Sequence, residues 1–512
     1  MKKTLSLLLA LVLLASVLFA CGEADPTESE TPSALSYGAE TDAETTETTA
    51  QSHCPPSEPP EESSAEEETS SEEPASSEEP VSSETPVSAE EPVSSEEPVS
   101  SEGPVSSEEP VSSEEPPETS SEEPVEEAVL PAKIYITTNS MIGKGNYVAC
   151  RIRVIDTTGK YEEIDDPEAT IKVRGNSTSS GNKKPYNIKF DKKQDVLGMG
   201  KCKKWCLLAN MYDKSLIRNK LAYDFASEIG LAYTQQSTFA DLYLNGKYLG
   251  CYQICESIGV GDSRVDIDIE GNEFLLEYEP WEGYSNPQFI YTPLMKKLFG
   301  FNDPEEPTTA QRAWLTQFFR DAENALYSKD RARIEQYWDI DSFVNDYIVH
   351  EYFKNVDAQT SSTRYYVKNG KIYGGPVWDF DLSAGNADSG YYTAYYVNGD
   401  SSKGWYCRHI WYDDLIVTGW FEDLVKQRFA EIQPIIVNLT TDNELGKNRI
   451  DLLIEQYGDC FRANFTEAGW SITSKDSPYE RVPLSTYEKN VEFLRKWLID
   501  RNTWMKAQFG IK

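Results

Sequence analysis

Two aspartates separated by one residue are the feature of this sequence best suited to chemistry. Asp379 and Asp381 lie in the run VWDFDLSAGN, where the residues between and beside them are apolar. If this run is a strand, both carboxylates project from the same face. Like charges at that spacing repel each other unless a proton or a cation lies between them. The pair therefore either caps an exposed loop or holds a metal ion.

A third acid points to the same chemistry. Asp357 occurs in NVDAQTSSTRYY, where a helix is expected to end and a strand to begin. Acids on separate loops with no histidine nearby in the sequence suit Mg²⁺, a hard cation that prefers oxygen ligands. In phosphoryl transfer one acid receives a hydroxyl proton and another holds the metal. The three aspartates therefore indicate a site that acts on phosphates.

A site for a triphosphate also requires positive charge. Lys183, Lys184 and Lys189 follow the stretch that begins at Arg174, RGNSTSSGNKKPYNIKF, and could supply it. Each of these residues taken alone is more typical of a solvated surface. Together with the acids they strengthen the prediction of a phosphate site in which the strand-rich part of the chain contributes the cations.

Histidines and cysteines give little support to other chemistry. The chain has three histidines, one of them within the expected stalk, and His350 fits a packed helical stripe. A histidine zinc site or a Ser-His-Asp hydrolase is therefore poorly supported. The nine cysteines include no CxxC motif but form two pairs spaced four residues apart, Cys202 with Cys206 and Cys251 with Cys255. Disulfides in an oxidising compartment and buried free thiols both fit these pairs, and a zinc site fits them less well.

The first residues resemble an export signal. Residues 1–20 combine two lysines, a short apolar run and a small residue at Ala20, which is typical of a secretory signal peptide. Cys21 follows directly and is the expected lipid-bearing residue of a bacterial lipoprotein, with ordinary secretion as the alternative. We therefore expect an extracytoplasmic protein that a lipid anchors to the outer face of the membrane.

The segment 21–129 is expected to be a disordered stalk. Prolines recur every six residues from Pro74 to Pro116 in the unit PVSSEE, and residues 22–132 contain 33 Asp or Glu and no Lys or Arg. A unit with one aliphatic residue cannot build a packed core. The stalk accounts for most of the formal net charge of −38, and residues 133–512 hold 46 basic and 53 acidic residues. The folded part has no basic stripe, so nucleic acid is not an expected partner.

Residues 130–512 form an α+β fold by their periodicity. Alternating runs predict a strand-rich lobe over about 130–300, with a hairpin turned at Asn245-Gly246. Helical periodicity dominates a second lobe over about 301–512, interrupted by a short strand pair hinged at Asn369-Gly370. The expected helices include the runs DKSLIRNKLAYDFASEIGL, AQRAWLTQFFRDAENALYS and SFVNDYIVHEYFKNV.

Four blocks of the chain resemble the spore coat protein H (CotH) kinase family, in the order that the family has them. They are RGNSTSSGNKKPYNIKF, LLANMYDKSLIRNKLAYDFASEIGL, LYLNGKYLGCYQICESI and GGPVWDFDLSAGN. The resemblance covers essentially all of 133–512. It implies an atypical protein-kinase-like fold of two lobes that transfers phosphate from ATP, with Mg²⁺ or Mn²⁺, to Ser or Thr of proteins, including itself.

The resemblance also implies roles for single residues. Asp357 matches the catalytic-loop acid, which orients and deprotonates the incoming hydroxyl, and Asp379 matches the metal-binding acid, assisted by Asp381. Relatives have Asn a few residues after the catalytic acid, where this chain reads Thr-Ser-Ser-Thr at 360–363. The chain has no glycine-rich loop of protein-kinase type, so side chains must hold the nucleotide. The residues expected to do so are Lys189, Arg174, Lys184 and, near adenine or paired with a cation, Glu256.

The favoured reading is an extracytoplasmic protein kinase whose substrate includes the chain's own serine-rich stalk. An inactive kinase-like fold that serves as a binding or scaffold module is the alternative, because ATP is scarce outside the cell. A carbohydrate hydrolase that uses Asp379 or Glu256 is a third and weaker reading, in which the many aromatic residues would stack on sugars.

Overall fold

The computed structural model describes residues 131–280, 288–358, 361–388, 390, 400–407 and 410–512. The expected signal peptide, Cys21 and the stalk over 21–129 lie outside these residues and stay predictions. Within the part of the chain that the structure describes, no helix combines the length and apolar character needed to cross a membrane.

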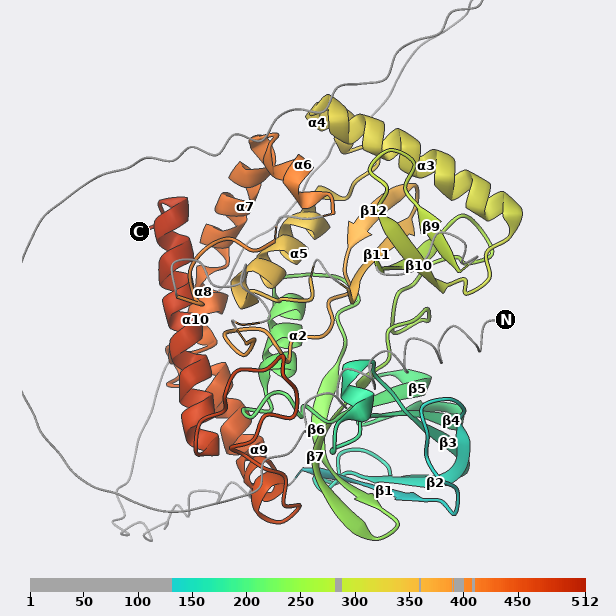
Figure 1. The fold of residues 1–512 in the computed structure, drawn as a ribbon, viewed down its shortest axis with the longest axis vertical. Helices are drawn as coiled ribbons and strands as arrows, with labels where there is room; N and C mark the ends of the chain where they lie inside the picture. The colour runs from blue at the N-terminus through green and yellow to red at the C-terminus, as the bar shows by residue number, and fades with distance from the viewer. Residues whose placement is uncertain (1–130, 281–287, 359–360, 389, 391–399, 408–409) are drawn as a thin grey trace, which may run out of the picture. The chain divides into compact units, whose positions relative to one another are not determined.

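Seven strands close into a barrel at the N-terminal end of the described chain (Figure 1). Their order is β1-β2-β3-β4-β5-β7-β6, and β1 pairs in parallel with β6 to complete the barrel. Alternate residues point inward and are buried, as the period of a strand requires. The strands are β1 (Ala132–Thr137), β2 (Val148–Ile155), β3 (Ile164–Val173), β4 (Tyr186–Asp195), β5 (Lys201–Leu208), β6 (Ser237–Leu244) and β7 (Lys247–Glu256).

Both turns expected from Asn-Gly pairs are confirmed. Asn245 and Gly246 connect β6 to β7 and both have positive φ, which asparagine and glycine adopt at little cost. Asn369 and Gly370 do the same between β11 (Thr363–Lys368) and β12 (Lys371–Gly374). Strand β5 has no counterpart among the expected strands, because its lysines occupy positions where an amphipathic strand would place apolar residues.

A second sheet joins strands from both sides of residue 300. Its order is β12-β11-β8-β10-β9. β8 (Phe274–Tyr278) pairs with β11, and β10 (Leu298–Asp303) pairs with β8 and with β9 (Phe289–Tyr291). The division expected near residue 300 therefore does not separate strands from helices. The structure confirms a mixed α+β fold, in which this sheet packs with the helices.

Helices make up most of the remainder. They are η1 (Ser177–Ser180), α2 (Arg218–Glu228), α3 (Thr309–Ser328), α4 (Arg331–Ile334), α5 (Ile340–Phe353), α6 (Tyr412–Ile416), α7 (Trp420–Glu431), α8 (Gln433–Asn438), α9 (Arg449–Thr466) and α10 (Tyr487–Phe509). Several begin at side chains that accept a backbone N–H, such as Thr308 for α3 and Asp339 for α5. Helix α2 begins five residues later than expected, because the Asp213 carboxylate accepts the backbone N–H groups of Ser215 and Arg218 and holds 213–217 in a turn.

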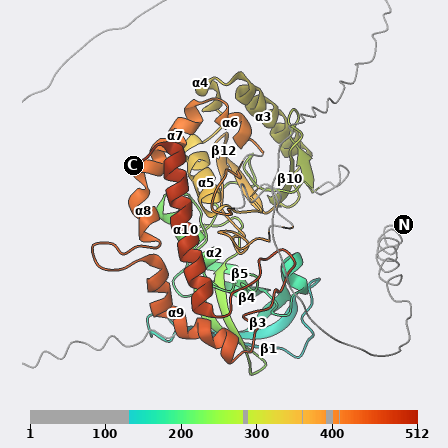
Figure 2. The ribbon, with the colours of Figure 1, turned by 60° about the vertical axis from the view of Figure 1, so that its left-hand side comes forward.

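Helix α2 lies between the barrel and the other helices, where it packs against α5 and α8 (Figures 1 and 2). α9 packs against β6 and β7, and α10 packs against α5 and α9. A fully buried ion pair between Glu351 of α5 and Arg501 of α10 connects two of these helices. Arg501 also donates to the carbonyl oxygen of Glu351, so little of its hydrogen-bonding capacity is lost on burial. These contacts form a rigid base for the loops between helices and strands.

Candidate active site

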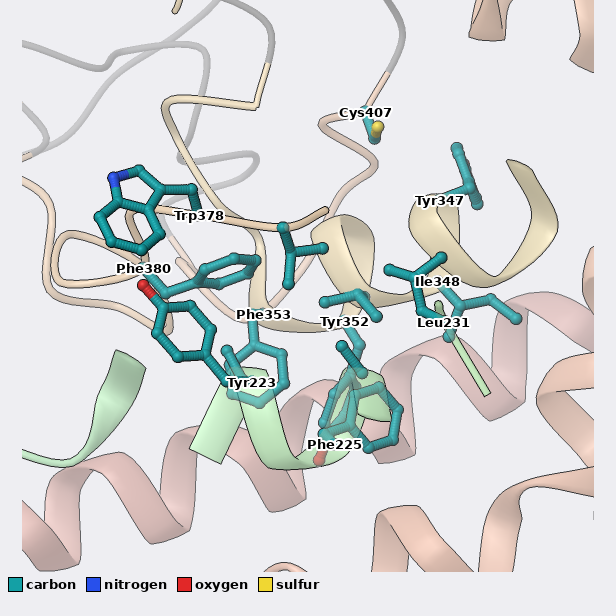
Figure 3. Close-up of a cluster of buried hydrophobic side chains, with 14 of the residues drawn as sticks. Tyr223, Phe225, Leu231, Tyr347, Ile348, Tyr352, Phe353, Trp378, Phe380 and Cys407 are labelled. Atoms are coloured by element: carbon teal, nitrogen blue, oxygen red, sulfur yellow. The ribbon is translucent and has the colours of Figure 1, made fainter. Parts of the chain in front are cut away.

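The loop of Asp379 and Asp381 is not a strand, so that expectation is wrong. The residues from Gly375 to Phe380 have no regular structure, and Asp379 adopts a φ of +65°. Pro376 has no N–H to donate to a sheet, and a left-handed residue breaks the alternation of a strand. The apolar side chains of the loop still point into the core, as Figure 3 shows for Trp378 and Phe380 beside Tyr223 of α2. Phe380, the one residue between the two acids, is buried in the core, and both acids line the cavity described below.

Hydrogen bonds from helix α2 and from Asn386 hold the loop of Asp379 and Asp381 in place. The Oδ1 atom of Asn219 accepts the backbone N–H of Phe380 at 2.8 Å. Arg218 donates to the carbonyl oxygen of Ser383 at 3.0 Å and forms a buried ion pair with Asp213. Asn386 donates to the carbonyl oxygen of Asp381 at 2.7 Å. The backbone of the acidic loop is thus held by buried side chains, a pattern typical of strained functional loops.

Asp357 follows α5, as expected. The helix ends at Phe353, and Lys354 adopts the left-handed conformation that ends many helices. The backbone N–H of Asp357 donates to the Oδ1 atom of Asn355 at 3.1 Å. A few residues further, the Thr363 hydroxyl donates to the carbonyl oxygen of Ala358 at 2.6 Å. Local hydrogen bonds therefore position Asp357 between the end of α5 and the start of β11.

All three aspartates line one cavity of about 400 Å³ between the barrel and the helices, a volume in the range of small-molecule sites. Asp357 and Asp379 are half-buried and Asp381 is buried. The barrel contributes the loop from β3 to β4 and the end of β5. Besides the aspartates, the charged lining residues are Lys144, Lys172, Arg174, Glu277 and Arg364.

The electrostatics of the three acids are coupled. Burial raises the pKa of Asp357, and the charge of Asp379 raises it further. Burial also raises the pKa of Asp381, and the charges of Asp379 and Asp357 raise it further. Burial also raises the pKa of Asp379, but the charges of Arg174 and Arg364 oppose this rise. Asp379 is therefore the acid that the surroundings favour most in its charged form, and a cation at this site would relieve the repulsion among all three.

Two arginines lie on the indole of Trp378. The guanidinium carbon of Arg174 is 5.1 Å from the ring centroid and that of Arg364 is 5.8 Å away. Arg364 forms an ion pair of 2.6 Å with Glu277, its directly opposite neighbour on β8. Arg174 was expected in the site, whereas Arg364 and Glu277 were not. A charged residue in the apolar strand run TRYYVK was the available signal for Arg364.

The other expected nucleotide-binding residues are not brought to the cavity. Lys184 donates to the carbonyl oxygen of Ser179 at 2.8 Å and so holds the loop from β3 to β4. Lys189 is exposed on β4, two residues beyond the cavity-lining Asn187. Glu256 is buried beside Arg264, 3.8 Å away, and accepts the backbone N–H of Gln236. Glu256 therefore does not line the cavity that Asp379 lines. The two acids named for a carbohydrate hydrolase are thus not placed together in one site.

Histidine and cysteine positions agree with structural roles. His350 is buried and stacks on Phe380, as expected for a core residue. Cys206, one member of the first expected pair, lies directly opposite Cys255, one member of the second, across β5 and β7. The seven cysteines that the structure describes are free thiols, and six of them are buried.

The donor set fits Mg²⁺ in its chemistry. Asp357, Asp379 and Asp381 offer only oxygen ligands, which hard cations prefer. Among the described residues, no three acid, cysteine or histidine side chains already form a cluster that could hold a metal ion. Mg²⁺ commonly takes one or two carboxylates and completes its shell with phosphate oxygens and water, so the separated aspartates suit a metal that arrives with a nucleotide.

Comparison with known proteins identifies the family of the chain. A family model described as CotH kinase protein matches residues 171–505, which include all three aspartates and both arginines of the cavity. A search of curated proteins found no match. The matched region covers more than half of the chain and indicates a kinase-type phosphotransferase. The chain belongs to the CotH kinase family.

Proposed function

We propose that this protein is a Mg²⁺-dependent protein kinase that transfers phosphate from ATP to Ser or Thr outside the cytoplasm. The observation that carries the proposal is one cavity lined by Asp357, Asp379 and two arginines that come from separate parts of the chain. Phosphoryl transfer depends mainly on positioning and on stabilising charge, and this cavity offers both acid and cationic groups for it.

Each residue has a distinct role in the proposal. Asp357 accepts a hydrogen bond from the acceptor hydroxyl and orients it. It receives the hydroxyl proton as the bond from the hydroxyl oxygen to the γ-phosphorus forms and the bond from that phosphorus to the β–γ bridging oxygen breaks, with ADP as the leaving group. Asp379, assisted by Asp381, would hold Mg²⁺, and the ion when bound would neutralise charge on the phosphate oxygens. Arg174 and Arg364 present planar guanidinium groups, which suit phosphate better than a lysine does. Their contact with Trp378 and the Arg364–Glu277 ion pair keep these groups in place.

The test uses the full mature chain with ATP and follows phosphate incorporation by labelled ATP and mass spectrometry. We expect phosphoserine or phosphothreonine on the chain, including its 21–129 stalk, in the presence of Mg²⁺ and none after chelation. Asp357→Ala and Asp379→Ala should each abolish incorporation, and Asp459→Ala, a change at an exposed acid outside the cavity, should not.

Calorimetry separates catalysis from a scaffold role. A kinase should bind ATP more tightly with Mg²⁺ than without it, and Asp379→Ala should remove that difference. If ATP does not bind under either condition, the inactive-scaffold reading replaces this proposal.

Location is part of the same proposal. Lipidation of Cys21 after removal of residues 1–20 would tether the kinase to the outer face of the membrane, with the stalk as spacer. Metabolic labelling with a radioactive fatty acid tests this directly. Label should appear in the wild-type protein and be lost in Cys21→Ser, whereas a secreted, unlabelled wild-type protein would contradict the anchor.

A further inference from the structure

A cluster of lysines on the β4–β5 hairpin has no role in the site described above. We define the lysine patch as the six exposed lysines of β4 and β5: Lys189, Lys192, Lys193, Lys201, Lys203 and Lys204. The two strands carry only two acids, Asp191 and Asp195, and the Asp195 carboxylate accepts the backbone N–H of Gly200. The hairpin is therefore strongly positive within a folded part of the chain that is acidic overall.

Two of these lysines are placed where their charges repel. Lys189 and Lys204 are direct partners in the antiparallel pairing of β4 with β5. Like charges directly opposite each other destabilise a sheet. Within the described residues, one ion pair involves the patch, between Lys193 and Asp262 at 4.0 Å, and Asp262 is fully exposed. Other exposed lysines have carboxylates closer by, such as Lys496, which pairs with Asp500 at 2.6 Å. The charge of Lys204 also acts on the carboxylate of Asp303, where it opposes the rise in pKa that burial causes. These few carboxylates neutralise six lysines only in part.

The patch continues the basic side of the cavity. Lys172 and Asn187 are direct partners on β3 and β4, and both line the cavity. Asn187 and Lys189 project from the same face of β4, about 7 Å apart along the strand, and Lys204 lies about 5 Å further on the neighbouring strand. Positive charge thus extends from the cavity along the outer face of the barrel through Lys189 and Lys204, and the other lysines of the patch lie near the turn end of the same two strands.

We infer that the lysine patch is a docking surface for acidic segments of the protein substrate, so that the kinase prefers Ser or Thr close to Glu or Asp. This inference rests on the proposed function. An extended peptide advances about 3.3 Å per residue, so a carboxylate two or three residues from the acceptor lies about 7–10 Å away from it. The step along β4 from the cavity-lining Asn187 to Lys189 has this size, so a segment that leaves the cavity along β4 brings such a carboxylate to the patch. Charge complementarity of this kind gives specificity and faster association.

The chain itself shows what such a segment looks like. The peptide PVSSEEPVSSEE, residues 104–115, places two glutamates directly after each pair of serines. It serves as the acidic probe, and PVSSQQPVSSQQ, blocked at both ends, is the neutral counterpart of the same length and acceptor content. Both are supplied in excess to the full mature chain.

The first experiment does not depend on catalysis. A carbodiimide joins lysine amines to carboxylates that lie in contact with them, and mass spectrometry locates the product. Crosslinks of the tagged acidic peptide should concentrate on the lysine patch and weaken at high salt. Lys447 and Lys489, two exposed lysines in the helical part of the chain, are the internal controls. Crosslinks spread evenly over patch and control lysines would overturn the inference.

The second experiment measures substrate preference. The ratio of kcat/KM for the acidic peptide to that for the neutral peptide should fall about tenfold in K189E/K204E. The variant K447E/K489E carries the same change in net charge and should keep the wild-type ratio. An unchanged ratio in K189E/K204E removes the docking role. If the wild-type chain phosphorylates neither peptide, the proposed function fails and the crosslinks alone decide whether the patch binds acidic peptide.

An anionic membrane surface is the competing partner for exposed lysines. Vesicles of phosphatidylcholine with and without phosphatidylglycerol are sedimented with wild-type protein and with K189E/K204E. Binding that requires phosphatidylglycerol and the two lysines, together with evenly spread peptide crosslinks, would assign the patch to lipid and overturn the inference. If both proteins sediment equally, Lys189 and Lys204 do not bind the lipid, and the peptide experiments decide the inference.

Discussion

The acidic loop and the lysine patch differ in how the protein holds their side chains. Asn219, Arg218 and the buried aromatic residues around Phe380 hold the loop of Asp379 through contacts that exclude water. The lysines of the patch stand in solvent on a strand pair and have few partners among the described residues. Groups that take part in chemistry need a fixed position, whereas long-range attraction of a charged partner tolerates mobile side chains.

The largest expected effect is on kcat, and its size should differ between variants of the two acids of the loop. Asp379→Asn is expected to lower kcat by about 10³-fold or more, because it removes the carboxylate that would hold the metal and on which the charges of Arg174 and Arg364 act. Asp381→Asn should cost less, about 10–10²-fold, since Asp381 is more deeply buried and lies behind Asp379. Steady-state kinetics at saturating ATP and Mg²⁺ measures both. Equal losses would show that the two carboxylates act as one unit.

Arg364 tests the cations of the cavity. Arg364→Lys keeps the positive charge opposite Glu277 but loses the planar fork that lies on Trp378. We expect kcat/KM for ATP to fall about 10–10²-fold with little change in stability. Arg462→Lys, at an exposed arginine of α9, is the matched control. Wild-type kinetics in Arg364→Lys, together with a loss in Arg174→Lys, would assign the phosphate contact to Arg174 alone.

Asn219 tests whether buried positioning matters. Asn219→Ala removes the acceptor for the Phe380 N–H and should lower kcat about tenfold and stability by about 1–3 kcal/mol. Asn448→Ala removes a buried asparagine that caps α9 and should lower stability by about 1 kcal/mol with kcat retained. Urea unfolding and initial rates at matched folded fractions separate the effects. A parallel loss of kcat in both variants would mean that global stability, and not the loop, sets the rate.

A buried lysine beside the site gives the smallest effect and sharpens the contrast with the exposed patch. Lys183 donates to the carbonyl oxygens of Ala209 and Cys251, and burial lowers its pKa from 10.5 to about 8. Between these two values the folded state holds this lysine neutral while the unfolded state is protonated. Unfolding therefore takes up a proton, and the free energy of unfolding contributed by Lys183 rises with pH across that window.

The corresponding variant is Lys183→Met. The stability of wild type relative to Lys183→Met should increase by roughly 2–3 kcal/mol between pH 8 and pH 10.5. Urea unfolding of both proteins at several pH values measures it. Lys189→Met, a change in the exposed patch, is the matched control for the loss of a lysine side chain. A constant difference between wild type and Lys183→Met would show that the ammonium stays charged inside the fold.

The acidic residues of the site could be predicted from the sequence, whereas the charged residues that surround them could be predicted only in part. The positions of Asp357 and Asp379 follow from the ends of α5 and of the β11–β12 pair, both of which local patterns predict. Arg364 and Glu277 were missed because they meet only through pairing of strands 87 residues apart. Lys189 was expected in the site but does not line the cavity. Alternation shows which face of a strand a residue occupies, but it does not show how far along the strand that face lines a cavity.

The sequence by itself determined most of the barrel strands but not β5, and it determined the two Asn-Gly turns, the main helices and the three acids, because periodicity, turn chemistry and charge are local properties of the chain. Tertiary structure alone decided that the WDFD run is a buried loop and not a strand. It also decided that Arg174 enters the cavity while Glu256 stays with Arg264. The physical reason is that burial and long-range pairing set which charges face each other, and no local pattern records those partners.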